Sequence, residues 1–182
     1  MNKIQIIVNN GAGTGSAVAV WKETKEYLQE NGISYNAYLT RYEKHAVKLA
    51  GQICGKIPEG PIYLLVVGGD GTINEVLNGI TDFDRVRLGV IPTGSGNDFA
   101  RNLGILRNTR EDLREITACI GQEQNGEKLQ RIDLGKVSWE GCEKPRIFGI
   151  SAGAGLDAIV CKKALHSKLK KILNRFDLGK LT

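Results

Sequence analysis

The stretch IYLLVVGGDGT (residues 62–72) joins an apolar run directly to a glycine-rich turn. An apolar run without polar alternation is typical of a strand that is covered on both faces, as in a parallel sheet. The next residues, INEVLNG, have helical spacing, so the turn leads straight into a helix. This order of strand, glycine turn and helix indicates a βα unit of an α/β fold.

The same order recurs on both sides of this unit. We expect strands at residues 3–8, 34–40, 62–67 and 88–91, and helices at residues 16–30, 43–54 and 110–121. Gly55 is expected to end the second of these helices. Strands that alternate with helices form a parallel sheet with helices on both faces. The sequence therefore predicts a three-layer, Rossmann-like α/β domain.

The pattern changes after residue 121. Residues 129–138 and 146–151 are expected to be strands joined by a hairpin-like connection, with no helix between them. We therefore divide the chain into an α/β domain, residues 1–134, and the start of a β-rich domain of β-sandwich type, residues 135–182. The last part is predicted to be an amphipathic helix, and the chain from Ile159 onward has a net charge of +6. The apolar stripe of this helix consists of Leu165, Leu169, Ile172, Leu173 and Phe176.

The composition argues against several classes of protein. The 182 residues are 41% hydrophobic and 25% charged, as in soluble globular proteins and unlike disordered chains. The four cysteines are far apart and form no CxxC pair, which argues against a structural zinc site. No apolar run approaches the ~20 residues of a membrane span, so we expect a cytoplasmic protein. The net charge of +5 comes from the C-terminal segment, so nucleic-acid binding is not expected.

Two of the predicted strands end in glycine-rich turns at what should be the same edge of the sheet. The first turn is Gly68–Thr72, and the second is PTGSGND, residues 92–98. A glycine turn that opens a helix presents backbone N–H groups and the positive helix end to an anion. The Asp70 carboxylate would repel a bare phosphate, so we expect it to hold Mg²⁺, a ribose hydroxyl or water. The alternative is a purely structural glycine turn capped by an aspartate.

A third glycine turn, residues 11–15, follows the first strand. It has the form G-x-G-x-G, with Ser16 where a dinucleotide fingerprint has its third glycine, and taken alone it could be only a tight turn. No acidic residue follows the second strand, so NAD binding of the Rossmann type is poorly supported, although Arg41 could pair with the 2′-phosphate of NADP. No G-x-x-x-x-G-K-[ST] string occurs, which excludes a Walker-type site.

Five elements of the chain occur together. They are GGDGTINEVLNG (residues 68–79), IPTGSGNDFAR (residues 91–101), the turn at residues 9–13, Thr40 followed by His45 and Ala46, and IDLG (residues 132–135). Together they resemble the diacylglycerol kinase catalytic domain family, which includes bacterial lipid kinases as well as ceramide and sphingosine kinases. The resemblance covers nearly the whole chain. NAD kinases share a GGDGT loop, whereas the GSGNDFAR element is the lipid-kinase form.

The resemblance implies an ATP-dependent kinase that transfers the γ-phosphate to a lipid hydroxyl, with diacylglycerol as the first expectation. It implies that Asp70, Asp98 and Asp133 organise Mg²⁺ and the phosphoryl group, as catalytic and metal-binding residues. Judged without the resemblance, Asp98 could be a helix N-cap and Asp133 a turn residue at a strand end. The nucleotide-binding candidates are Asn9, Asn10, Gly11, Ala12, Gly13, Thr40, Gly68, Gly69, Asp70, Gly71, Thr72, Ile73, Asn74, Glu75, Gly94, Ser95, Gly96 and Asn97.

One motif that the resemblance leads us to expect does not occur. In this family a D-G-E acid in the β-rich domain acts as general base toward the lipid hydroxyl, and the chain contains no D-G-E. Because phosphoryl transfer depends on positioning, we interpret the chain as a fragment that binds Mg-ATP and has little or no kinase activity alone. The alternatives are an NAD kinase-like enzyme and a noncatalytic nucleotide-binding protein or membrane adaptor.

The resemblance also implies where the protein acts. We expect a lipid substrate at a membrane surface, a role in phospholipid metabolism, no nucleic-acid partner and no transmembrane segment, and we leave a homodimer open. The protein would be cytoplasmic or peripheral to the inner face of the membrane. The basic C-terminal helix could bind anionic lipid, but we favour an ordinary helix whose apolar face packs on the second domain.

Overall fold

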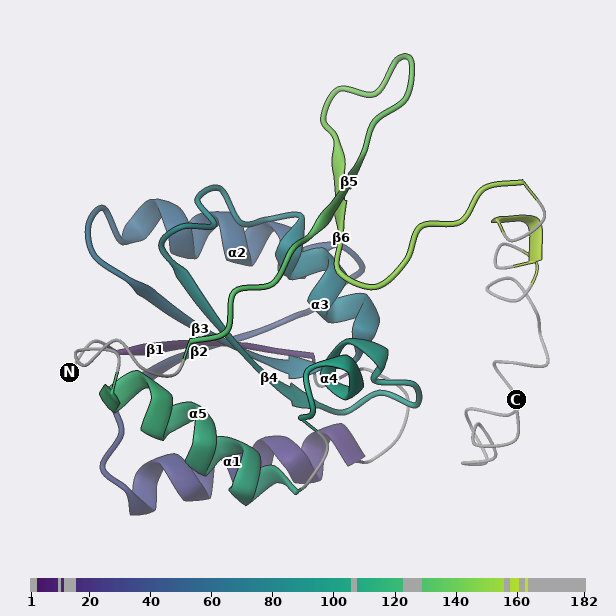
Figure 1. Cartoon of the computed structure of the whole chain (residues 1–182). Helices are drawn as coiled ribbons and strands as arrows, with labels where there is room; N and C mark the ends of the chain where they lie inside the picture. Colours follow the sequence, from purple (N-terminus) through teal and green to yellow (C-terminus); the bar gives the residue numbers. More distant parts are fainter. Residues whose placement is uncertain are drawn as a thin grey trace.

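A four-stranded parallel sheet lies at the centre of the computed structural model, which describes residues 3–9, 11, 16–105, 108–122, 129–155, 158–160 and 163. The strand order is β2-β1-β3-β4. The strands are β1 (Ile4–Val8), β2 (Tyr35–Leu39), β3 (Ile62–Gly68) and β4 (Val86–Pro92). Helices cover both faces of the sheet (Figure 1), so this part of the chain is the predicted three-layer α/β domain.

The helices divide between the two faces of the sheet. Helices α1 (Ser16–Glu30) and α5 (Thr109–Gln122) lie on one face, and α2 (His45–Lys56) and α3 (Asp70–Leu77) lie on the other (Figure 1). The short helix α4 (Asp98–Asn102) follows β4. Because consecutive strands along the chain are parallel, each βα loop that follows a strand emerges at the same edge of the sheet.

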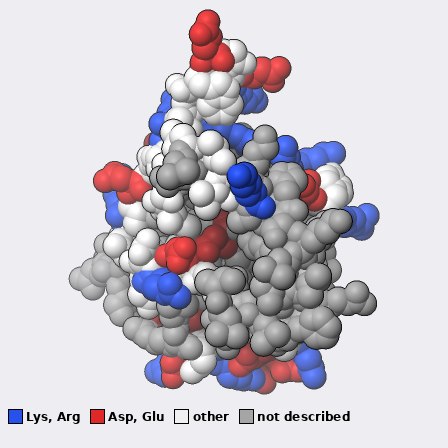
Figure 2. Space-filling model, turned by 90° about the vertical axis from the view of Figure 1, so that its right-hand side faces the viewer, with Lys and Arg blue, Asp and Glu red and all other residues white. Residues whose placement is uncertain are grey.

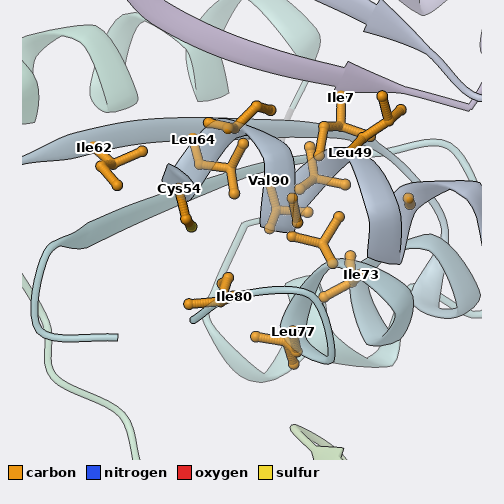
Figure 3. Packing of buried hydrophobic residues seen from close by; sticks show 14 of the residues in the cluster. Ile7, Leu49, Cys54, Ile62, Leu64, Ile73, Leu77, Ile80 and Val90 are labelled. Carbon is orange, nitrogen blue, oxygen red and sulfur yellow. The ribbon is translucent and has the colours of Figure 1, made fainter. Parts of the chain in front are cut away.

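Alternation along the strands divides the apolar side chains between two cores, because successive residues of a strand point to opposite faces. The α2/α3 core contains Ile62, Leu64 and Val66 of β3, packed against α2, α3 and Phe99. Figure 3 shows how closely these side chains meet under the sheet. The α1/α5 core contains Leu65 and Val67 of the same strand with Trp21, Leu28 and Leu113. Strand β3 is thus buried on both faces, which confirms the prediction made from its apolar run.

Strands β5 (Gly135–Val137) and β6 (Arg146–Phe148) form an antiparallel hairpin, which projects from the α2/α3 side of the domain (Figure 1). The hairpin was predicted, but its strands are shorter than the expected ranges 129–138 and 146–151. Residues 129–133 are exposed and, among the described residues, have no strand beside them, so they form no ladder. The division into domains at residue 134 remains a prediction.

Two further expectations about helices have different outcomes. Gly55 does not end α2, which continues to Lys56, because this glycine does not adopt the left-handed backbone with which glycine commonly ends a helix. The predicted amphipathic helix with its stripe at residues 165–176 lies outside the described residues. Among the helices that the structure does describe, none is long and apolar enough to cross a membrane.

Candidate functional site

The carboxyl ends of the four parallel strands lie side by side at one edge of the sheet. The Thr40 N–H donates to the Val8 carbonyl over 2.9 Å, and the Asn9 N–H donates to a carbonyl of β3 over 2.9 Å. At the next strand pair, the Thr93 N–H donates to the Gly68 carbonyl over 3.1 Å. These contacts place the residues after β2, β1, β3 and β4 in one row, so the two predicted glycine loops are neighbours.

The three glycines of the GGDGT loop have different surroundings. A Cβ at Gly68 would lie 2.7 Å from the Cβ of Thr72, and a Cβ at Gly69 would lie 3.1 Å from the Cα of Gly94 in the second loop. A Cβ at Gly71 would meet no atom of the described residues within 4 Å. The first two glycines therefore allow close packing inside the protein, whereas Gly71 leaves open space at the N-terminus of α3.

Asn9 connects the turn after β1 to the GGDGT loop. Its Nδ2 donates to Thr72 Oγ1 over 2.8 Å, and its Oδ1 accepts the Gly11 N–H over 3.2 Å. One side chain thus fixes two of the predicted nucleotide-binding elements to each other. Three other candidates from this turn, Asn10, Ala12 and Gly13, lie outside the described residues.

Asp70 connects the GGDGT loop to the second glycine loop. Its Oδ2 accepts the Asp98 N–H and its Oδ1 accepts the Phe99 N–H, each over 3.1 Å. The first N–H groups of a helix have no partner inside the helix, so this carboxylate caps α4 and compensates its positive end. The sequence placed Asp70 at a ligand site and did not predict that it also holds the neighbouring loop.

Asn97, and not Asp98, occupies the N-cap position of α4. Asn97 has a left-handed backbone with φ of 54°, and its side chain both accepts from the Gly94 N–H and donates to the Gly94 carbonyl, each over 2.8 Å. Asp98 is the first residue of the helix, and its Oδ1 lies 3.3 Å from Nη1 of Arg101. The alternative prediction that Asp98 is a helix N-cap is therefore wrong.

The carboxylates of Asp70 and Asp98 approach each other at Gly96. A Cβ at Gly96 would lie 3.3 Å from Oδ2 of Asp70 and 3.7 Å from Oδ2 of Asp98. Carboxylate oxygens beside a phosphate site are the donors that Mg²⁺ prefers. Within the described part of the chain, no three acidic, His or Cys side chains are grouped as a metal site requires, so Asp133, on the segment before β5, does not join these two acids.

Glu75, another nucleotide-binding candidate, caps a neighbouring helix. Its Oε1 accepts the Lys44 N–H over 2.9 Å, and its Oε2 accepts the Ala46 N–H over 3.1 Å. Lys44 has φ of 64°, a left-handed conformation that lysine rarely adopts. The carboxylate thus stabilises both the start of α2 and the strained residue before it.

A cleft of about 700 Å³ opens beside these loops. One side contains Gly71, Asn74 and Asp98, and the other is formed by the β5–β6 hairpin and the residues that follow it, 146–152. The apolar residues on the hairpin side are Val137, Ile147, Phe148 and Ile150. Figure 2 looks onto this end of the molecule and shows acidic side chains near the middle of the face. The open space at Gly71 therefore lies next to a partly apolar surface.

Asn78 fixes the hairpin to α3. Its Nδ2 donates to the Ile147 carbonyl over 2.8 Å, and its Oδ1 accepts the Ile147 N–H over 3.0 Å. The side-chain amide thus pairs with β6 as a residue of a neighbouring strand would. Gly149 also packs closely, since a Cβ there would lie 3.1 Å from Cδ1 of Leu77 in α3 and 2.6 Å from the Phe99 ring in α4. Sequence reasoning missed Asn78, because its partner lies 69 residues away.

The remaining candidates differ in exposure. Ser95 and Asn74 are exposed at the site and Thr40 is half-buried, whereas the Ile73 side chain is buried in the α2/α3 core. Thr93 lies in the second glycine turn and was not among the candidate binding residues. Its hydroxyl is buried at the end of β4 and has no hydrogen-bond partner among the described residues. A buried hydroxyl of this kind is rare in folded proteins.

Comparisons with known proteins agree with this geometry. The sequence model of the diacylglycerol kinase catalytic domain matches residues 3–137. The diacylglycerol kinase of Bacillus subtilis (strain 168) is 36% identical over 136 residues, which cover 72% of this chain and 40% of that protein. The diacylglycerol kinase of Staphylococcus carnosus (strain TM300) is 34% identical over 175 residues, covering 96% of this chain and 51% of that protein.

A solved structure is similar as well. The crystal structure of a diacylglycerol kinase from Bacillus anthracis str. Sterne superposes with a TM-score of 0.53 and 29% sequence identity, covering 64% of this chain and 39% of that one. The chain spans about half the length of the curated relatives it matches. The sequence comparisons and the structural comparison thus point to the same family of proteins.

Proposed function

Because the chain belongs to the diacylglycerol kinase catalytic domain family, we propose that it binds Mg-ATP at the carboxyl edge of its sheet as part of a lipid kinase. The observation that carries this proposal is the position of Gly71. It leaves open space at the N-terminus of α3, between two glycine loops and beside a cleft. Unpaired N–H groups at a helix start, with no side chain in front of them, suit a phosphate group.

The proposed nucleotide site uses the row of loops at the sheet edge. The phosphates would lie against the N–H groups from Gly69 to Gly71, with Thr40 and Ser95 providing hydroxyls nearby. Asp98, supported by Asp70, would hold Mg²⁺, which neutralises charge on the transferring phosphoryl group when it is bound. Asp70 has a second task, because its contact with the start of α4 keeps Asp98 beside the phosphates.

The acceptor in this proposal is a lipid hydroxyl at a membrane surface, with diacylglycerol as the first candidate. It would approach through the cleft, whose hairpin side is partly apolar. The chain contains no D-G-E acid, so we propose that it phosphorylates lipid slowly or not at all by itself. Asp133 as a third catalytic acid, a homodimer and association with the inner face of the cytoplasmic membrane remain predictions.

The test is a calorimetric titration of the chain and its Gly71→Ala variant with Mg-ATP. The added methyl group meets no atom of the described residues but occupies the space given to a phosphate oxygen, so we expect affinity to fall at least about tenfold, or 1.4 kcal/mol. Alanine is the better helix former, so the variant should be no less stable than the wild type. If Gly71→Ala instead disturbed the fold, ATP affinity and the free energy of unfolding would fall together.

The matched control is Gly121→Ala on α5, where a Cβ also meets no atom within 4 Å in the part of the chain that the structure describes. This variant should bind Mg-ATP like the wild type. NADP in place of ATP tests the NAD kinase alternative, and Asp98→Asn should reduce the dependence of ATP binding on Mg²⁺. Unchanged ATP affinity in Gly71→Ala, or tighter binding of NADP than of ATP, would contradict the proposal. Rapid phosphorylation of diacylglycerol micelles by the chain alone would contradict its inactivity.

A further inference from the structure

The loop between β2 and α2 carries an exposed aromatic ring that the site described above does not use. Tyr42 is 58% exposed, and its ring is stacked on the His45 ring, with the centroids 4.3 Å apart and an angle of 23° between the planes. His45 thus supports the ring of Tyr42, while more than half of the Tyr42 surface remains open to solvent. A supported, open π-face is suited to stacking with another planar ring.

The loop is fixed by hydrogen bonds at both ends of the stacked pair. The Arg41 N–H donates to His45 Nδ1 over 3.1 Å, and the His45 N–H donates to the Tyr42 carbonyl over 3.2 Å. The bond to Nδ1 requires that a neutral His45 carry its proton on Nε2. Glu75 then ties the following turn to α3 through the N–H of Lys44. The ring pair is therefore held in place before any ligand binds.

Backbone strain in the same loop is a second indication of a functional surface. Lys44 has φ of 64°, which costs a residue with a side chain about 1–2 kcal/mol. Strained backbone persists only where surrounding contacts impose it, and it is concentrated at ligand-binding positions. Here the contacts that impose it come from Glu75 of α3, the helix whose N-terminus faces the proposed phosphates.

The position of the loop in the fold decides which ligand the ring can meet. Tyr42 follows Thr40, which lies beside Asn9 in the row at the sheet edge. The end of β2 is two strands from the GGDGT loop, roughly 10 Å at the usual strand spacing. That separation is of the order of the distance from the phosphates of a nucleotide to its base. The cleft extends from α3 and α4 to this loop, because Glu43 and Lys44, the two residues after Tyr42, also line it.

We infer that Tyr42, supported by His45, is the stacking platform for the purine base of the bound nucleotide. The inference rests on the proposed Mg-ATP site and adds the residues that recognise the base. It assigns the two ends of the nucleotide to different elements, with the phosphates at α3 and the base at the β2–α2 loop. Stacking does not depend on the pattern of hydrogen-bonding groups, so ADP, ATP and GTP should all use this ring.

The experiment compares a ligand with a base to one without. Mg-ATP and Mg-tripolyphosphate are titrated by calorimetry into the wild type and into the variants Tyr42→Ala, Tyr42→Phe and Phe83→Ala. Because it loses one base–aromatic contact, the Tyr42→Ala variant should bind Mg-ATP about 5- to 100-fold more weakly than the wild type. Tripolyphosphate binding should not change, and Tyr42→Phe should keep the affinity for ATP. Phe83 is also exposed, but it precedes β4, the outer strand on the side of the sheet opposite to β2. Phe83→Ala should therefore bind both ligands normally.

A second measurement detects the contact directly. Tyr42→Trp places a fluorophore at the same position, and its emission should be quenched when Mg-ATP binds and unaffected by Mg-tripolyphosphate. Phe83→Trp is the control and should show no change with either ligand. This readout does not depend on a change in affinity, so it remains valid if Tyr42→Ala alters the loop.

The outcomes separate this inference from the proposed function. A wild type that binds neither ligand overturns both. A wild type that binds Mg-ATP, with Tyr42→Ala binding it equally well, overturns only the role of Tyr42. Equal losses for ATP and tripolyphosphate would also overturn that role, because they would show a general effect on the loop and no contact with the base.

Discussion

The two faces of the sheet are held together by different kinds of contact. On the α2/α3 face, the chain just after α3 approaches α2 so closely that a Cβ at Gly79 would lie 2.1 Å from the Val47 carbonyl oxygen. On the opposite face, α1 and α5 are joined by exposed ion pairs from Arg110 to Glu30, at 2.8 Å, and to Glu23, at 3.8 Å. The α2/α3 face therefore includes a backbone contact that tolerates no added atom, whereas the α1/α5 face includes ion pairs whose side chains can adapt.

The largest expected effect is at Gly79. In Gly79→Ala the new methyl group would overlap the α2 backbone, so the two helices must separate, and we expect the free energy of unfolding to fall by at least about 3 kcal/mol. Gly51→Ala, whose Cβ would lie 3.3 Å from the Gly79 carbonyl oxygen, should show a smaller loss. Urea unfolding followed by circular dichroism measures both.

Gly121 on α5 provides the comparison from the other face. A Cβ there meets no atom of the described residues within 4 Å, so Gly121→Ala should leave stability unchanged or raise it by up to about 1 kcal/mol. Gly55→Ala is the matched control within α2, where the space is also open. Equal losses at Gly79 and Gly121 would show that the two faces do not differ.

The next effect concerns the carboxylates of the two faces. Glu75→Gln removes the charge and one of the two acceptor oxygens that cap α2, so we expect a loss of about 1–3 kcal/mol in stability. Glu30→Gln removes an exposed ion pair, and its loss of stability should be much smaller than that of Glu75→Gln. Thermal unfolding of the two variants side by side makes the comparison. A greater loss of stability in Glu30→Gln than in Glu75→Gln would contradict this prediction.

The smallest effect is a dependence on pH. The hydrogen bond from Arg110 holds the pKa of Glu30 below its ordinary value of 4.5. A carboxyl whose pKa is lower in the folded than in the unfolded protein stabilises the fold above the unfolded value, and this contribution disappears as the pH falls through the folded value. Unfolding curves at pH 7 and at descending acidic pH should therefore show the stability of wild type and Glu30→Gln converging. A difference that grows in acid would contradict this assignment.

The sequence predicted those features that depend on neighbours along the chain. The apolar run of β3, the helical spacing of α1 and the glycine loops after β3 and β4 are local signals, and the structure confirms each of them. The predicted strand at residues 129–138 was too long, because a strand also needs a partner, and only residues 135–137 have one among the described residues.

Contacts between distant residues could not be predicted in the same way. Asp70 was identified as a site residue from its place in the glycine loop, but its partners at the start of α4 lie 28 and 29 residues further on. Glu75 and Asn78 likewise bind backbone groups 29 to 69 residues away. Single polar residues on a helix give no sign of such partners, since the same residue types are common on solvated faces.

The pairing of Asn78 with β6 has a consequence for hydrogen exchange. The Ile147 N–H donates to a side chain of α3 and not to β5, so its exchange with solvent requires separation of the hairpin from the helix, while the hairpin strands can stay paired. Exchange at this amide therefore reports how often the cleft opens, and amides in β3 report unfolding of the whole domain. A ligand that binds across the cleft should slow the first rate before it affects the second.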